Sequence, residues 1–371
     1  MSKQYLPLEI ASNLDHPNRE FEEIKKMFQK NGISIMDDAN EDDWLDFVLT
    51  EKFLNPDYRG KFLEINNALR ARNDFLKSFV DPGKQHREHL NVKSEWIDMC
   101  AGPVLADRWA RNKQVYKPDA DFAKMLIGTE KLQFTKEQLQ HVPADTFFID
   151  YSDCKQFAPI EGALVHVRVI GQKVAISQFI YWHDKTDTLI CSSYHLRRMF
   201  NDDDILDCSM MSMKDARYYV SGDKEANYTE KRVEECINTV VFFTLQCICY
   251  LTSKEPEITE SRKSAYRKPT PGIAPKNKYS EIQLWDVGVR YGKTVRMQQE
   301  SDSEGQKITQ ESNGTSDRRS PSPHFRSAHW SHYWTGKGRK NRETRWIAPV
   351  FVGFNAENKV VRDVVIHRIK N

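Results

Sequence analysis

The sequence lacks an excess of charge of either sign, and it lacks a long hydrophobic run. Its 55 Lys and Arg residues stand against 53 Asp and Glu residues, and the net charge of +2 excludes a generic polyanion-binding protein. The longest apolar stretch, Val240–Leu251, is interrupted by Thr244 and Gln246 and is too short to cross a bilayer. The sequence therefore predicts a protein without a membrane partner.

Paired cysteines and cofactor motifs are also missing. The seven cysteines are odd in number and have no paired spacing, and MSKQYLPLEI does not resemble a signal peptide, so we expect reduced thiols and a cytoplasmic location. The chain has no phosphate-cradling glycine loop, no GxSxG motif and no kinase or deaminase signature. No cofactor is therefore predicted.

What the chain does contain begins with helices. Apolar residues recur at three- and four-residue steps through residues 1–140, which predicts a helical N-terminal region. Its expected helices are Glu20–Asn31, Glu41–Leu54, Gly60–Val80 and His89–Lys113, the last broken around Gly102 and Pro103.

The hydrophobic period changes from 3.6 to 2 near Pro143, which predicts an antiparallel sheet within residues 141–297. Its centre is a three-stranded meander of Ala163–Ile170, Lys173–Trp182 and Thr188–Tyr194, with a tight turn at Gly171. Alternation places His166 on the polar face of the first strand, where we interpret it as a solvated residue.

Residues 227–252 are predicted to form a buried central helix, because their second half is apolar nearly all round. The Pro-rich stretch Lys254–Tyr279 is expected to be an irregular strap, and Glu281–Met297 to be a strand or a helix. Residues 298–322 lack aromatics and predict a disordered loop. Residues 323–371 are expected to complete the sheet, with Phe354–Asn371 as an added strand.

The most informative stretch is Pro323–Gly353, which holds three Trp, three His and six Lys or Arg against one Glu. Aromatic rings interleaved with cations offer stacking surfaces and two-point contacts to phosphate or carboxylate groups. This pattern predicts an aromatic/basic β-hairpin with a binding surface. The candidate binding residues are Arg326, His329, Trp330, His332, Tyr333, Trp334, Arg339, Arg342, Arg345 and Trp346.

Several functions are compatible with this segment. His324, His329 and His332 could bind zinc, although no Cys or carboxylate lies nearby in the sequence to complete the site. Two His beside Arg could cleave RNA by acid–base catalysis without a metal. A groove for a peptide or single-stranded nucleic acid is a third reading, and a structural hairpin with Trp inside and Arg outside is a fourth.

The same segment resembles the C-terminal signature of a phage and plasmid anti-CRISPR family, whose best-known member suppresses production of the type V-A effector nuclease. That signature comprises an Arg, a His-Trp pair, Tyr-Trp-x-Gly, a basic turn and Arg-Trp-x-x-x-x-Phe-Val. The matching residues here are Arg326, His329, Trp330, Tyr333, Trp334, Gly336, Arg345, Trp346, Phe351 and Val352.

Weaker similarity extends the resemblance over roughly residues 140–353. The matching segments are Val142–Thr146, Glu255–Thr259 with Arg267–Pro269, and Asp286–Gly288 with Gly292 and Val295–Arg296. One departure concerns histidine: the family has its second His two residues after the first, where this chain has Ser331, and His332 follows instead. A one-residue shift in a strand turns a side chain to the other face, so a two-His catalytic pair does not carry over.

The resemblance implies an anti-CRISPR protein of a mobile element that acts in the cytoplasm of a bacterial host cell. Its implied partner is the nascent N-terminal peptide of a CRISPR effector, with the ribosome or the mRNA as further contacts, and recognition leads to loss of the mRNA. The chain is thus interpreted as an α+β protein for which a binding role is preferred, while an enzymatic role as a ribonuclease stays open. The alternatives are a metal-independent ribonuclease that uses His329 or His332, and a nucleic-acid-binding regulator of a mobile element.

Overall fold

A seven-stranded sheet forms the centre of the protein, with strand order β6-β5-β4-β3-β1-β9-β8. The computed structural model describes residues 6–12, 14, 17–30, 38–49, 92–129, 132–183, 189–208, 227–261, 282–293, 296, 324–326, 328–339, 341–347 and 350–352. Its longest strands are β4 (Gly162–Ile170), β5 (Lys173–His183) and β6 (Leu189–Met199), which form the predicted antiparallel meander. Gly171 has φ 58° in the turn between β4 and β5, as a tight hairpin requires.

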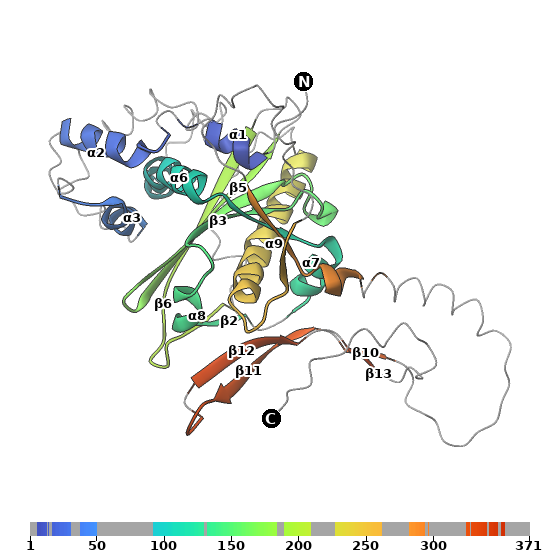
Figure 1. Ribbon diagram of the computed structural model, residues 1–371. Helices are drawn as coiled ribbons and strands as arrows, with labels where there is room; N and C mark the ends of the chain where they lie inside the picture. Colours follow the sequence, from blue (N-terminus) through green and yellow to red (C-terminus); the bar gives the residue numbers. More distant parts are fainter. Residues whose placement is uncertain are drawn as a thin grey trace, which may run out of the picture.

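One face of the sheet is covered by N-terminal helices. These are α1 (Leu6–Ser12), α2 (Glu20–Lys30), α3 (Glu41–Leu49) and α6 (Val92–Asn112). Their apolar residues form one cluster with Phe148, Leu164 and Phe179 of the sheet (Figure 1). The predicted helical N-terminal part is therefore a layer on the sheet.

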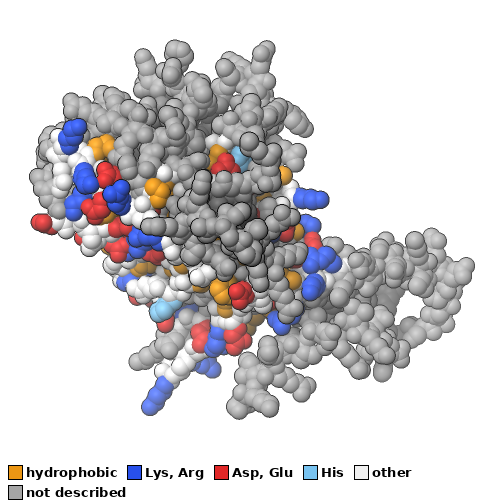
Figure 2. Space-filling model, turned by 45° about the horizontal axis from the view of Figure 1, so that its top comes forward, with side chains coloured by type: hydrophobic (Ala, Val, Ile, Leu, Met, Phe, Trp, Pro, Cys, Tyr) orange, Lys and Arg blue, Asp and Glu red, His pale blue; other side chains and the backbone are white. Residues whose placement is uncertain are grey.

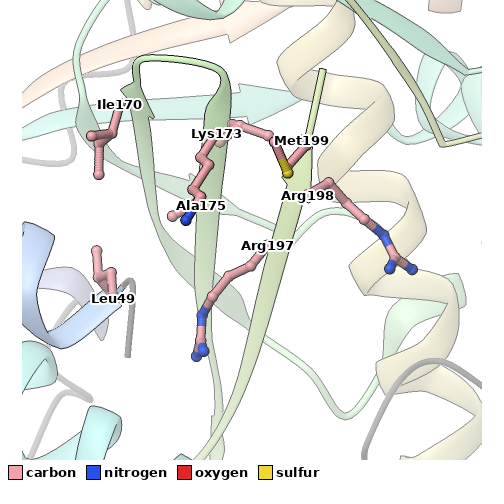
Figure 3. A pocket seen from close by; sticks show the side chains of 8 residues that line it. Leu49, Ile170, Lys173, Ala175, Arg197, Arg198 and Met199 are labelled. Carbon is pink, nitrogen blue, oxygen red and sulfur yellow. The ribbon is translucent and has the colours of Figure 1, made fainter. Parts of the chain in front are cut away.

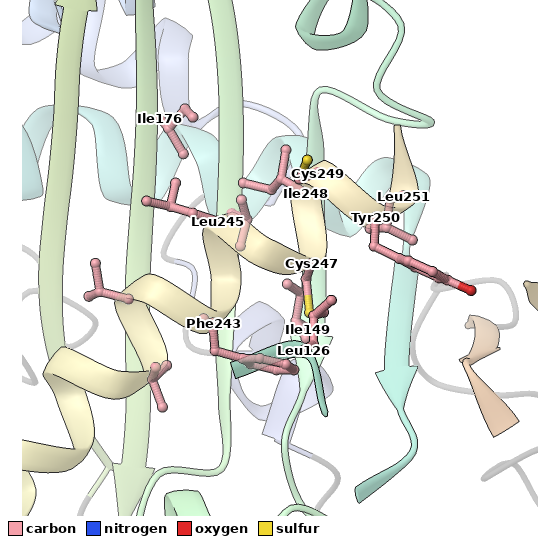
Figure 4. Packing of buried hydrophobic residues seen from close by; sticks show 14 of the residues in the cluster. Leu126, Ile149, Ile176, Phe243, Leu245, Cys247, Ile248, Cys249, Tyr250 and Leu251 are labelled. Atoms are coloured by element: carbon pink, nitrogen blue, oxygen red, sulfur yellow. The ribbon is translucent and has the colours of Figure 1, made fainter. Parts of the chain in front are cut away.

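The opposite face is covered by α9 (Asn227–Leu251), the predicted central helix, and by α7 (Ala120–Ile127). The second half of α9 buries Phe243, Leu245 and Ile248 completely against Ile149 and Ile176 of the sheet (Figure 4). The α+β class, with a sheet packed on a buried helix, is confirmed. No helix in the described ranges is long and apolar enough to cross a membrane.

The sheet is mixed because of one strand that the sequence did not predict. β1 (Gln114–Pro118) lies between β3 (Thr146–Asp150) and β9 (Gln283–Val287) and is parallel to both. The helical region predicted for residues 1–140 did not include this strand, because it is only five residues long, follows α6 directly and is too short to show a period. The edge strand β8 (Ile258–Glu260) completes this side.

The remaining short elements extend the core. They are β2 (Gln133–Thr135) paired with β7 (Ile205–Asp207), α8 (Lys136–Gln140), the 3₁₀ turn Lys155–Phe157, and β10 (His324–Arg326) paired with β13 (Val350–Val352). All seven cysteines are free thiols. The helix expected at Gly60–Val80, the loop 298–322 and the strand Phe354–Asn371 lie outside the described residues.

Helix α6 continues through Pro103, where the sequence predicted a break. A proline inside a helix costs about 3 kcal/mol, since it removes a backbone donor and crowds the preceding turn. Ala101, Val104 and Leu105 beside it are almost completely buried. Packing of this segment against the sheet thus offsets the local cost.

Ion pairs hold the N-terminal layer on the sheet. Arg108 of α6 lies 2.6 Å from Asp42 and 2.7 Å from Asp145. Arg168 of β4 lies 2.8 Å from Asp46 of α3. Charges of both signs are interspersed over the face shown in Figure 2, which agrees with the balanced composition.

His166 is fully buried, so the prediction of a solvated strand residue is wrong. Alternation correctly separated it from Val165 and Val167, but the N-terminal helices cover its face of the sheet. Its Nδ1 lies 2.9 Å from Thr146 Oγ1. Burial lowers the pKa of the imidazole to about 4, and the nearby Arg108 and Arg168 guanidinium groups act in the same direction.

We expect His166 to make the protein less stable as the pH falls. In the unfolded chain a histidine takes up its proton near pH 6.5, whereas the folded protein resists protonation until about pH 4. The unfolded state therefore binds more protons in this window, and the free energy of unfolding falls progressively as the pH drops through it. Urea titrations between pH 7 and pH 4.5 should show a shallower pH dependence for His166→Gln. Equal slopes for the two proteins would contradict this prediction.

Gly288 occupies a site that no other residue fits. It has φ 70°, and a Cβ there would overlap the ring of Phe122 on α7. A Cβ at Gly292, one turn later, would overlap the Asp119 carboxylate. Asp119 caps α7 by accepting from the amides of Asp121 and Phe122. Arg296 lies 3.0 Å from the same Asp119 carboxylate. The Asp286–Arg296 motif thus fixes the start of α7 against the segment after β9.

Gly288→Ala is expected to lower the free energy of unfolding by about 2–4 kcal/mol, the sum of left-handed backbone strain and overpacking. Gly171→Ala is a matched control, because Gly171 also has a positive φ but has nothing within 4 Å of the new methyl group. It should show only the backbone strain, about 1–2 kcal/mol. Chemical denaturation measures both, and equal losses would rule out the overlap with Phe122.

Candidate functional site

The aromatic/basic hairpin consists of β11 (His329–Thr335) and β12 (Asn341–Ile347), which pair in antiparallel register with Trp330 opposite Trp346. Gly336 and Gly338 have φ 78° and 76° in the turn between the strands. Within the described strands the hairpin is a separate two-stranded sheet, whereas the sequence predicted that it completes the main sheet. The hairpin packs against the protein body through the bulky side chains of its inner face. Layers packed face to face lie about 10 Å apart, twice the distance between hydrogen-bonded strands, so the hairpin does not pair with the main sheet.

Trp330 anchors the inner face of the hairpin on α9. Its side chain is only 7% exposed, and its indole Nε1 donates a 2.7 Å hydrogen bond to Gln246 Oε1. Gln246 Nε2 in turn donates to the Thr129 carbonyl at 2.9 Å. The polar residue that interrupts the apolar run of α9 is therefore the partner of Trp330, a role that the sequence analysis missed.

Trp346 anchors the hairpin next to Trp330. Its ring meets Phe122, Tyr250 and Tyr291 edge to face, with centroid separations of 5.3, 5.5 and 4.8 Å. Aromatic pairs at this spacing each contribute about 0.5–1.5 kcal/mol beyond area burial. The structure thus places both Trp330 and Trp346 against the protein body, as the hypothesis of a structural hairpin with Trp inside predicts.

His332 and Thr344 form the middle of the inner face. His332 Nδ1 lies 3.2 Å from Thr344 Oγ1, which itself donates to Gln138 Oε1 at 3.1 Å. Burial lowers the pKa of His332 to about 4, with a further contribution from Arg342. His332 is therefore a neutral imidazole near pH 7, while the exposed His329 lies on the opposite face of the strand.

The far end of the hairpin exposes Tyr333 on one face and Trp334 on the other, with basic side chains nearby. Tyr333 and Trp334 are 42% and 56% exposed, and in the described part of the chain Met199 is the one other exposed large apolar residue. The Arg345 guanidinium lies 5.2 Å from the centroid of the Tyr333 ring, in cation–π geometry. Arg339 is exposed in the turn.

Neighbouring groups hold the cations of the hairpin in place. Arg345 donates to Glu343 Oε2 at 2.8 Å, and Lys254 reaches the same oxygen at 3.0 Å. These hydrogen bonds, that of Arg345 first, lower the pKa of Glu343 to about 2. Arg342 donates to Gln133 Oε1 of β2 at 2.6 Å. Arg326 lies outside the hairpin, in β10, where its backbone is in register with Val350 of β13.

The predicted site residues therefore separate into two groups. Trp330, His332 and Trp346 lie on the face that contacts the protein body, and Tyr333, Trp334 and Arg339 lie at the exposed end. Among the residues that the structure describes, no group of three or more His, Cys, Asp or Glu could hold a metal ion. The exposed end is suited to binding a partner by stacking and charge.

These features describe an α+β protein that presents an aromatic/basic hairpin anchored on a buried helix. The model of the anti-CRISPR type V subtype A2 family, AcrVA2-like, matches residues 116–354, which is more than half of the chain. The chain belongs to this family. The match begins in β1, earlier than the resemblance seen in the sequence, and it includes the whole hairpin.

Other comparisons add little to the family assignment. The crystal structure of AcrVA2 is similar at 16% sequence identity and a TM-score of 0.39, over 91% of this chain and 100% of that chain. No curated protein matches the sequence. The helices α1, α2 and α3 lie outside the matched range.

Proposed function

We propose that this protein lowers the synthesis of a CRISPR effector nuclease by recognising the effector's N-terminal peptide as it emerges from the ribosome, and that loss of the effector mRNA follows. The observation that carries the proposal is the exposure of two aromatic rings at the end of one strand. Tyr333 lies on one face of the hairpin with the Arg345 guanidinium over its ring, and Trp334 lies on the other face. Large exposed aromatic rings cost solubility, so a hairpin end that keeps one on each face, 42% and 56% exposed, is suited to a partner.

An extended peptide matches this surface in two ways. Within the described strands β11 and β12 pair only with each other, so β11 has a backbone edge to which an extended peptide can add as a further strand. The edge of β12 is partly used, because the Lys254 amide donates to the Thr344 carbonyl at 3.4 Å. The aromatic rings then cover apolar side chains of the peptide, and the cations meet its acidic groups or the nearby ribosomal RNA. In this mode the backbone hydrogen bonds of the added strand supply affinity, and contacts of its side chains supply specificity.

The test separates the peptide from the message that encodes it. Radiolabelled mRNA for a type V-A effector is incubated with the purified protein in a translation extract, with and without active ribosomes. One message carries synonymous codons over its first codons, so its RNA changes and its peptide does not. A second message is frameshifted over the same codons and then restored, so its peptide changes and its RNA is nearly unchanged.

We expect loss of the synonymous message during translation and survival of the frameshifted message. Without ribosomes both messages should stay intact. Loss of the frameshifted message with survival of the synonymous one would show RNA recognition and overturn the proposal. Cleavage of naked RNA that disappears in His329→Ala would instead establish the ribonuclease.

A further inference from the structure

A cavity of about 390 Å³ lies at the end of the β4–β5–β6 meander, beside the last residue of α3. Its lining includes Ala175 and Leu49, which belong to the apolar cluster under the N-terminal helices, and Val174, which belongs with Trp330 to the cluster around α9. Both faces of the sheet therefore contribute to the cavity, and Lys173 and Arg197 project from the face of Ala175, opposite the hairpin anchor. A ligand here would not compete for the hairpin surface.

The charged residues that line the cavity are all cations. Lys173, Arg197 and Arg198 contribute to its wall, and among the described lining residues none is a carboxylate. Lys173 pairs with Met199 and Ala175 pairs with Arg197, so Lys173 and Arg197 are diagonal neighbours on one face of the sheet. Arg197 and Arg198 leave β6 on opposite sides, and Lys173 and Arg197 face the side of Leu49 (Figure 3).

Two cations on one face in a partly buried site favour a ligand with more than one negative charge. Burial lowers the pKa of the Arg197 guanidinium to about 10, because a charged group is less stable where water is excluded. A guanidinium fork with a neighbouring ammonium group matches the oxygens of a phosphate, the Arg by two-point contact and the Lys by charge.

The rest of the wall sets the size and polarity of the ligand. Leu49, Ile170 and Met199 are aliphatic, and no aromatic ring is present among the lining residues described. The volume falls in the range of small-molecule sites, about 300–1,000 Å³. The cavity thus fits a compact ligand with one strongly anionic end and a less polar body.

We propose that this cavity binds a phosphate monoester through Lys173 and Arg197, supplied either by a free nucleotide or by the 5′ end of an RNA. The proposal does not rest on peptide recognition by the hairpin. It adds a second site, with its two cations on the other face of the sheet, that senses phosphorylated ligands.

Calorimetry with the full-length protein tests the site with four probes. Two carry a phosphate monoester: adenosine monophosphate and a short RNA with a 5′-phosphate. The other two are the same RNA with a 5′-hydroxyl and a peptide of acidic residues with the same net charge as adenosine monophosphate. We expect the 5′-phosphate RNA or the nucleotide to bind more tightly than the 5′-hydroxyl RNA and the peptide. The stronger of the first two identifies the source of the phosphate. Equal affinity for the acidic peptide would overturn the proposal.

Substitutions locate the binding site. Lys173→Gln, at an exposed position, should weaken binding of the preferred phosphate probe at least about tenfold, and Arg197→Gln by as much or more. Lys337→Gln is a matched control that removes the same charge from the hairpin turn, and it should leave the affinity unchanged. Because Lys173 is exposed, its variant remains informative even if Arg197→Gln fails to fold. Equal weakening by Lys337→Gln, or none by Lys173→Gln, would refute the site.

Discussion

Trp330→Ala is expected to lower the free energy of unfolding by about 3–5 kcal/mol, the usual cost of removing a buried Trp. The indole is 7% exposed within the α9 cluster, and it donates to Gln246. Its loss opens a cavity and leaves a buried amide with one partner fewer. Chemical denaturation gives the stability, and hydrogen exchange in β11 and β12 shows whether the hairpin separates from α9.

Trp334→Ala is the matched control for this experiment. Trp334 lies on the same strand and the same face as Trp330, four residues later, but its side chain is 56% exposed. Its truncation should change the free energy of unfolding by less than about 0.5 kcal/mol. Similar losses for the two variants would mean that the inner face of the hairpin does not end where the structure places it.

The double substitution Tyr333→Ala and Trp334→Ala is expected to abolish suppression of the effector while the thermal midpoint stays near that of the wild type. Truncating an aromatic residue at the centre of an interface typically costs about 2–4 kcal/mol of binding, and a tenfold loss of affinity corresponds to about 1.4 kcal/mol. The loss should therefore exceed about thirtyfold in calorimetry with the effector's N-terminal peptide.

Met199→Ala is the control for exposed apolar surface in general. Met199 is 65% exposed and lies on β6, outside the hairpin. We expect this variant to bind the peptide and to suppress the effector normally. Retention of peptide binding in the Tyr333 and Trp334 double variant would show that recognition occurs elsewhere on the protein.

Local patterns predicted much of the fold correctly. The meander followed from alternation and a glycine turn, and α9 from an apolar run of helical length, because these signals depend on neighbours in the chain. β1 escaped detection because five residues give no period, and its position between β3 and β9 depends on segments distant in sequence. Pro103 was misjudged because the packing that offsets it comes from other elements.

For the candidate site, the sequence by itself determined which residues gather in the hairpin and which of them share a face. It could not determine which face is covered, because that depends on what packs against the strand. The tertiary structure decided that Trp330 and Trp346 are anchors and that Trp334, on the same face, extends beyond the protein body. It likewise decided that His166 is buried and that Lys173 and Arg197 line one cavity. Side-chain alternation is a local property of the backbone, whereas burial is a property of the whole packed chain.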